Sequence, residues 1–187
     1  MSNWNAPSTQ VDRFGEMWFT DSSCKTVAAL VRETNHLTGR VIEIGSWCGR
    51  STVHIAHAAY PQHVHCVDTW EGTPNEISGE LAQTRDVWEQ WSTNVDELTR
   101  GNVEPFRMGW RDYVQLDDSP VRFCFIDAEH TYEEVYDNIE SIRPLLVEGA
   151  VLCGDDMAHP PVYEAVKDQL GEFDIQASLW IWRNVGS

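Results

Sequence analysis

Acidic residues follow two apolar runs of strand length in the second half of the chain. The first run, 121–126, ends at Asp127, and the second, 150–153, is followed after one glycine by Asp155 and Asp156. A helix-length amphipathic segment joins the two runs, which predicts a βαβ unit with parallel strands. Because neighbouring parallel strands end at the same edge of a sheet, the three carboxylates are expected to converge there. Clustered carboxylates repel one another unless a cation lies between them, and their hard oxygens suit Mg²⁺, Ca²⁺ or Mn²⁺.

A second set of candidate residues lies in the stretch VIEIGSWCGRST, residues 41–52. It starts with a short strand, 41–44, after which Gly45 and Gly49 form a loop whose backbone a ligand can approach closely. Their spacing differs from the GxGxxG fingerprint of dinucleotide-binding proteins, and the loop lacks the lysine of a P-loop. Glu43, inside the strand, disfavours a phosphate ligand. The loop is therefore predicted to bind a ligand that carries a cationic group.

Asp68 follows the next predicted strand, 63–67. A carboxylate at the tip of the second strand of such a unit is placed to accept hydrogen bonds from a ribose diol. An ordinary turn residue is the simpler interpretation of the same acid. Together with the glycine loop, Asp68 predicts a βαβ unit that binds a nucleoside, without an evident place for a diphosphate.

The elements that must position these residues form an α/β domain. Residues 1–20 are predicted to be an N-terminal arm whose aromatic side chains pack on the body or cover a site: Trp4, Phe14, Trp18 and Phe19. Strands are predicted at 41–44, 63–67, 102–108, 121–126, 150–153, 173–176 and 179–182. Helices are predicted over 24–37 with a cap at residues 21–23, over 51–60, over 81–99, after Asp127, and over 162–170. Trp88 and Trp91, three residues apart on the third helix, are expected in the core.

The composition limits the classes of partner. The chain has 187 residues, of which 42% are hydrophobic, and this fits one domain with a real core. Its net charge of −17 disfavours nucleic acids and anionic membranes as partners. The five cysteines include no CxxC pair, which predicts buried, reduced thiols in a cytoplasmic protein and no zinc site. No apolar run approaches the ~18 residues of a membrane span, and the polar N-terminus gives no sign of a signal peptide.

Four blocks of the chain together resemble the class I S-adenosylmethionine (SAM)-dependent methyltransferases. The resemblance is greatest to the small-molecule branch that includes the macrocin and aminocoumarin sugar O-methyltransferases. The blocks are VIEIGSWCGRST, VHCVDTWEG, FCFIDAEHTYEEVYDNI and LLVEGAVLCGDDM, and they span roughly residues 40–157. The resemblance implies one domain over residues 1–187, a Rossmann-like three-layer αβα sandwich. Its seven-stranded, mostly parallel sheet would have the order 3-2-1-4-5-7-6, with the last strand antiparallel.

The resemblance also implies roles for particular residues. SAM would lie over the tips of the first two strands, with Glu43 near its methionine amino group and Asp68 at its ribose. The residues implied to bind the cofactor are Glu43, Gly45, Ser46, Ser51, Asp68, Thr69, Trp110 and Asp127. In metal-dependent members an acid after strand four and an adjacent pair after strand five bind Mg²⁺; here these are Asp127, Asp155 and Asp156. The family base falls two or three residues after the first metal acid, at Glu129 or His130.

The chemistry of methyl transfer agrees with these residue types. An in-line displacement at a sulfonium needs alignment of donor and acceptor, a lowered pKa at the acceptor hydroxyl, and a nearby base. His130 suits the base at neutral pH because its unperturbed pKa is about 6.5, whereas Glu129 would need burial or a nearby metal ion. Simpler interpretations are an arginine partner for Glu43, a helix cap made by Asp155 and Asp156, and a capping or packing role for His130.

The sequence therefore predicts a SAM-dependent, Mg²⁺-dependent O-methyltransferase for a small hydroxylated molecule such as a sugar or a polyketide-type metabolite. Three alternatives stay open: a metal-free methyltransferase on the same fold, a SAM- or nucleoside-binding protein without turnover, and an NAD enzyme, which the missing GxGxxG disfavours. The chain is short for a closed acceptor pocket. A second copy of it is therefore a candidate partner that would supply a wall.

Overall fold

Apolar strands produce a sheet that is buried on both faces. In the computed structural model, which describes residues 13–186, every residue of β4 (Val121–Ile126) is buried. Parallel neighbours on either side, β1 (Arg40–Ile44) and β5 (Leu146–Gly154), complete its hydrogen bonding. The other strands extend the sheet at both edges: β2 (Val64–Asp68), β3 (Val103–Arg107), β7 (Leu179–Arg183) and β6 (Asp174–Gln176). The order β3-β2-β1-β4-β5-β7-β6, with β7 antiparallel to both neighbours, confirms the predicted topology.

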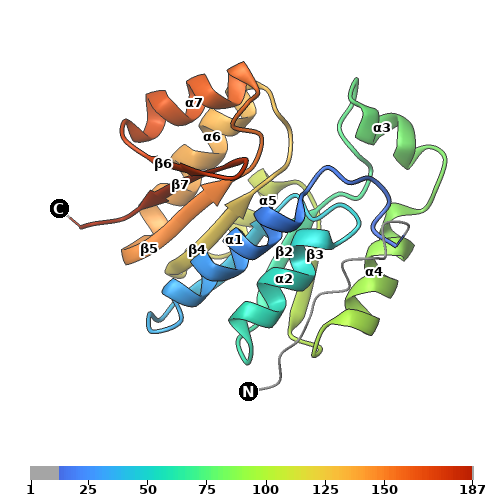
Figure 1. Ribbon diagram of the computed structural model, residues 1–187, viewed down its shortest axis with the longest axis horizontal. Helices are drawn as coiled ribbons and strands as arrows, with labels where there is room; N and C mark the ends of the chain where they lie inside the picture. Colours follow the sequence, from blue (N-terminus) through green and yellow to red (C-terminus); the bar gives the residue numbers. More distant parts are fainter. Residues whose placement is uncertain (1–12, 187) are drawn as a thin grey trace.

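Helices cover both faces of this sheet (Figure 1). Successive strand residues point to opposite faces, so Phe123 and Phe125 of β4 join one hydrophobic core and Cys124 and Ile126 join the other. The first core is closed by α1 (Asp21–Glu33), α2 (Arg50–Ala59) and α4 (Val87–Leu98). The second core is closed by α5 (Trp110–Leu116), α6 (Tyr132–Ile142) and α7 (Pro160–Leu170). A 3₁₀ turn (Arg143–Leu145) leads into β5, and α3 (Ile77–Ala82) stands beyond the end of the sheet. The predicted three-layer αβα sandwich is thus confirmed.

Two predicted helices have wrong boundaries. The first begins at Asp21 and not at residue 24, because the hydroxyl of Thr20 accepts the backbone N–H of Ser23 and caps it. The helix predicted over 81–99 corresponds to α4, which begins only at Val87, and the preceding α3 was not predicted. They are separated because the carboxylate of Asp86 accepts the backbone N–H of Glu89 and starts a new helix.

Strand β5 is longer than predicted. It begins at Leu146, whereas the apolar run suggested a start at residue 150. Gly149 has φ of +82°, and its N–H donates to the carbonyl of Asn184, so the first part of the strand also has a backbone partner. The pairing with β4 is irregular there. Val121 pairs with Leu146 and Phe123 pairs with Val151, so the register between the two strands shifts between these pairs.

Several expectations about side chains are confirmed. Trp91 is buried, and its ring lies 4.6 Å from that of Trp70 and 5.3 Å from that of Trp88, so this cluster belongs to the core. All five cysteines are buried and none forms a disulfide. Among residues 13–186, no helix has the length and apolar character needed to cross a membrane. Of the predicted arm, Trp4 lies outside the described residues, whereas Phe19 packs edge-on against Phe125.

Candidate active site

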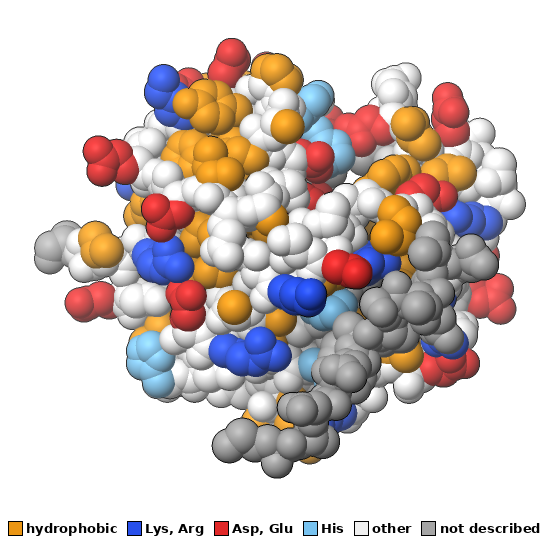
Figure 2. Space-filling model, in the orientation of Figure 1, with side chains coloured by type: hydrophobic (Ala, Val, Ile, Leu, Met, Phe, Trp, Pro, Cys, Tyr) orange, Lys and Arg blue, Asp and Glu red, His pale blue; other side chains and the backbone are white. Residues whose placement is uncertain are grey.

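A cavity of about 770 Å³ lies at the carboxyl ends of β1, β2, β4 and β5. Figure 2 shows acidic and histidine side chains gathered in a hollow near the top of the molecule. The cavity is lined by every predicted site residue except Glu43: Gly45, Ser46, Ser51, Asp68, Thr69, Trp110, Asp127, Glu129, His130, Asp155 and Asp156. The topology therefore brings the two halves of the predicted site into one space.

Gly45 is required by the protein's own backbone. Its φ is +87°, and a Cβ added there would lie 2.0 Å from the carbonyl oxygen of Asp127. The sequence suggested instead that this glycine gives a ligand access to the backbone. The structure adds a stronger reason, because the loop after β1 crosses directly over the end of β4.

Asp68 joins the loops that follow β1 and β2. Its Oδ2 accepts the backbone N–H groups of Ser46 at 2.8 Å and Trp47 at 2.9 Å. Its Oδ1 accepts the N–H of Trp70 at 2.7 Å, which is the bond of an ordinary turn. Asp68 thus serves as a turn residue and also holds the glycine loop in place on the wall of the cavity.

Glu43 lies behind the glycine loop, fully buried. Its Oε2 accepts the hydroxyls of Ser46 at 2.8 Å and Thr52 at 2.5 Å. Burial raises the pKa of this carboxyl, and the hydroxyl hydrogen bonds oppose that rise. No arginine among residues 13–186 pairs with Glu43, so that simpler interpretation is wrong. Glu43 does not line the cavity, but its partner Ser46 does, so Glu43 supports the cavity wall through Ser46.

Glu43→Ala is expected to lower the free energy of unfolding by about 2 to 4 kcal/mol, because two buried hydroxyl donors lose their acceptor. Urea unfolding followed by circular dichroism would measure this. Glu43→Gln is the matched control, since its amide oxygen still accepts a hydrogen bond and should lose less stability. An alanine variant as stable as the wild type would contradict this account.

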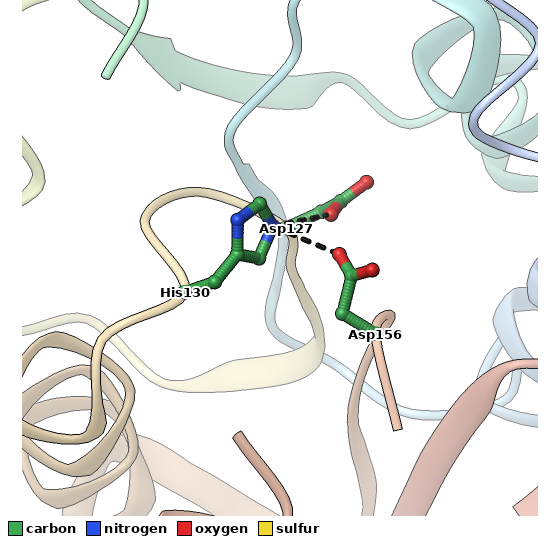
Figure 3. Close-up of side chains that lie close together, drawn as sticks. All are labelled: Asp127, His130 and Asp156. Atoms are coloured by element: carbon green, nitrogen blue, oxygen red, sulfur yellow. Dashed lines mark ion pairs between the residues drawn. The ribbon is translucent and has the colours of Figure 1, made fainter. Parts of the chain in front are cut away.

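Three side chains meet where β4 and β5 end (Figure 3). The Nε2 of His130 lies 2.8 Å from a carboxylate oxygen of Asp156 and 3.9 Å from one of Asp127. These three residues offer ligand atoms close enough together to hold a metal ion. Asp155, the third predicted ligand, is buried beside them, and its Oδ1 has no hydrogen-bond partner. The structure therefore groups His130 with Asp127 and Asp156, whereas Asp155 is not one of the three residues whose ligand atoms lie together.

The cluster shifts the pKa values of its own members. Burial raises the pKa of Asp127 to about 7, and the charges of Asp155 and Asp156 add to this. Burial alone would lower the pKa of His130, but its hydrogen bonds to Asp127 and Asp156 raise it to about 11. The hydrogen bond from His130 to Asp156 lowers the pKa of Asp156. In this arrangement His130 is therefore an imidazolium at neutral pH that offsets the negative charge of the carboxylates.

Asp155 and Asp156 do not cap the following helix. α7 begins at Pro160, and the residue at its N-cap is His159. Asp156 instead has a φ of +60°, in the left-handed region, where it turns its carboxylate toward His130. The helix-cap interpretation of this acidic pair is therefore wrong.

Two acids that sequence reasoning did not select, Glu16 and Glu76, also line the cavity. Glu16 of the arm forms an ion pair with Arg85 and accepts the indole N–H of Trp47 at 3.3 Å. The ring of Trp18 lies 5.7 Å from that of Trp47, and both line the cavity. Glu76 contacts His130. The sequence signal that could have identified Glu76 is the pair of glycines, Gly72 and Gly79, that begin and end the stretch GTPNEISG. The described part of the predicted arm therefore lines the cavity.

A model of the methyltransferase domain family matches residues 42–157 of this sequence, a span that includes the glycine loop and the carboxylate cluster. The chain belongs to the methyltransferase domain family. This confirms the prediction from the sequence motifs that the protein is a methyltransferase. The comparison of this methyltransferase with curated protein sequences gave no match.

Solved O-methyltransferase structures share the fold of this methyltransferase. NovP has a TM-score of 0.70 at 18% identity, over 88% of this chain and 80% of its own. TomG from Streptomyces achromogenes, solved in complex with SAM, has a TM-score of 0.70 at 16% identity, over 96% and 87%. CalS11, a TDP-rhamnose 3′-O-methyltransferase, has a TM-score of 0.62 at 15% identity, over 96% and 88%. At these identities the likeness is one of fold.

Proposed function

We propose that this methyltransferase transfers the methyl group of SAM to a hydroxyl of a small molecule and uses a divalent cation to do so. One observation carries the proposal: the glycine loop with Asp68 and the carboxylate cluster line the same cavity. A donor bound at the first site would therefore have its methyl group beside an acceptor bound at the second.

The cofactor would occupy the β1–β2 side of the cavity. Asp68 has lone pairs beyond its three backbone hydrogen bonds and would accept the ribose hydroxyls. Trp110 lines the cavity further along, where its ring would flank the adenine, and its indole N–H is held by Glu134 at 2.9 Å. The remaining members of the proposed set contribute hydroxyls and backbone around the methionine part: Gly45, Ser46, Ser51, Thr69 and Asp127. Glu43 would support this wall from behind.

The carboxylate cluster fits a divalent cation. Asp155 carries a buried oxygen without a hydrogen-bond partner, and burial raises its pKa, so a positive partner would stabilise its charged form. Asp127, Asp155 and Asp156 would hold the ion through hard oxygen atoms, which suit Mg²⁺ or Mn²⁺. A bound ion of this kind would supply a lowered pKa at the acceptor hydroxyl.

His130 is the proposed base, with Glu129 as the alternative on the same loop. His130 holds its proton because carboxylates surround it. A divalent cation held by those carboxylates would offset their charge, and the His130 ring would then be placed to accept the proton of the hydroxyl. Glu129 also lines the cavity, and its Oε1 accepts the hydroxyl of Thr131 at 3.2 Å.

The proposed acceptor is a sugar or a polyketide-type metabolite with adjacent hydroxyls. Trp18 and Trp47 give the cavity an aromatic wall that packs against either a planar ring or the apolar face of a sugar. The structurally similar CalS11 is named for a sugar acceptor, which supports this class. A net charge of −17 agrees with a small molecule rather than a nucleic acid as partner.

Calorimetric titration with SAM, in the presence and absence of Mg²⁺, tests the proposal. The wild type is expected to bind SAM. Asp155→Ala is expected to keep that binding and to bind Mg²⁺ at least about 10-fold more weakly, because one carboxylate of the cluster is lost. Transfer of a labelled methyl group to 3,4-dihydroxybenzoate, a diol probe, should stop when EDTA is added.

Asp118→Ala is the matched control, because this exposed acid is not among the residues that line the cavity. It should behave as the wild type in both titrations. A wild type that does not bind SAM would contradict the proposed function. Full activity in EDTA would contradict the metal and favour a metal-free methyltransferase on the same fold.

A further inference from the structure

His130 is held at both of its ring nitrogens by carboxylates from separate parts of the chain. Nε2 faces Asp156 at 2.8 Å, and Nδ1 lies 3.2 Å from an oxygen of Glu76. Glu76 belongs to the long connection between β2 and α4, whereas Asp156 follows β5. A ring fixed at both nitrogens has one orientation, because a flip would break both contacts.

The side chain of Glu76 is turned away from its own helix. Glu76 is the N-cap residue of α3, in the extended conformation that a capping residue adopts, but it makes no side-chain cap hydrogen bond. Its carboxylate instead points to His130 and is about one-third exposed, with 30% of the side-chain surface accessible. A carboxylate normally gains by accepting N–H groups at a helix start. Because the Glu76 carboxylate makes no such bond at the start of α3, we infer that its contact with His130 decides its conformation.

Residues 72–79, here called the Glu76 loop, are closed tightly on themselves. A Cβ on Gly72 would lie 2.4 Å from the carbonyl oxygen of Ser78, and one on Gly79 would lie 2.3 Å from that of Thr73. The N–H of Thr73 also donates to the hydroxyl of Ser78 at 3.1 Å. The two ends of the loop are therefore in backbone contact, and the loop presents Glu76 from a fixed base.

We propose that Glu76 is a positioning residue for His130 in methyl transfer. Its carboxylate accepts the Nδ1–H, which directs Nε2 toward the carboxylate cluster and the acceptor. A carboxylate that orients a histidine in this way keeps the reactive nitrogen in the correct tautomer. This inference rests on the proposed function, because it is the transfer reaction that needs His130 oriented.

Nuclear magnetic resonance of the full-length protein with SAM, with ¹⁵N-labelled histidine at pH 7, tests the contact. His130→Gln assigns the signal among the seven histidines. The wild type is expected to show a slowly exchanging Nδ1–H at His130, and Glu76→Ala is expected to lose it. Glu76→Gln should retain it, because the amide oxygen still accepts the hydrogen bond. Glu80→Ala, an exposed acid of α3, is the matched control and should match the wild type.

Methyl transfer to 3,4-dihydroxybenzoate provides the functional readout. Glu76→Ala should turn over about 10- to 100-fold more slowly with unchanged affinity for SAM, and Glu76→Gln should recover part of the loss. An unchanged Nδ1–H signal in Glu76→Ala, or an unchanged turnover, would overturn the positioning role. A wild type that does not bind SAM would overturn the proposed function and this role with it. That result differs from a failure of the positioning role alone, in which SAM binding persists.

Discussion

Asp68→Ala is expected to bind SAM at least about 100-fold more weakly than the wild type. Two hydrogen bonds from the ribose diol to a charged acceptor contribute about 1.5–3 kcal/mol each, and every 1.4 kcal/mol is tenfold in affinity. The substitution also releases the backbone N–H groups of Ser46 and Trp47, so the glycine loop loses its anchor. Calorimetric titration with SAM measures the effect directly.

The control for Asp68 must separate ligand contact from loss of structure. Asp86→Ala removes another carboxylate that accepts a backbone N–H, that of Glu89 at 2.9 Å, but Asp86 is not among the residues that line the cavity. It should bind SAM as the wild type does, although it loses a helix cap. If Asp68→Ala keeps wild-type affinity while its circular dichroism is native, the ribose assignment is wrong.

Gly45→Ala is expected to lose about 3 kcal/mol or more of stability. A residue with a Cβ is strained at a φ of +87°, and the new methyl group would lie 2.0 Å from the carbonyl oxygen of Asp127. Relief is difficult because the N–H of Gly45 donates to Val67 and the N–H of Asp127 donates to Ile44. Any movement therefore disturbs the sheet where the glycine loop and the carboxylate cluster meet. SAM affinity should fall as well. Urea unfolding and SAM titration measure the two effects.

Gly101→Ala is the matched control for Gly45. Gly101 also has a positive φ, +73°, but a Cβ there meets nothing within 4 Å. Its alanine variant should lose only about 1–2 kcal/mol, the cost of the left-handed conformation. The difference between the two variants isolates the clash with Asp127. Equal losses would show that the closeness of the two strand ends has no energetic importance.

The strands were predictable because their information is local. The six-residue run of β4 is buried along its whole length and is apolar except for Arg122, as expected of a parallel strand with helices on both faces of the sheet. The break between α3 and α4 also has a local signal, the capping pair Asp86 and Glu89. The apolar periodicity of 81–99 led to a single predicted helix despite that signal. The early start of β5 was not predictable from its own residues, since Glu148 and Gly149 interrupt the apolar run and this part is held by Asn184 from the end of the chain.

The sequence by itself determined the fold, the family and the strand ends at which acidic residues gather. Those properties follow from apolar runs and short motifs, whose effect depends on neighbours along the chain. Tertiary structure decided that Glu43 is buried behind the cavity wall, that carboxylates raise the pKa of His130, and that Glu76 contacts His130. Each of these depends on groups from distant segments, because burial and the charges of neighbouring carboxylates set a pKa and a side-chain orientation. They exist only once β1, β4 and β5 lie side by side and the Glu76 loop brings its carboxylate to His130.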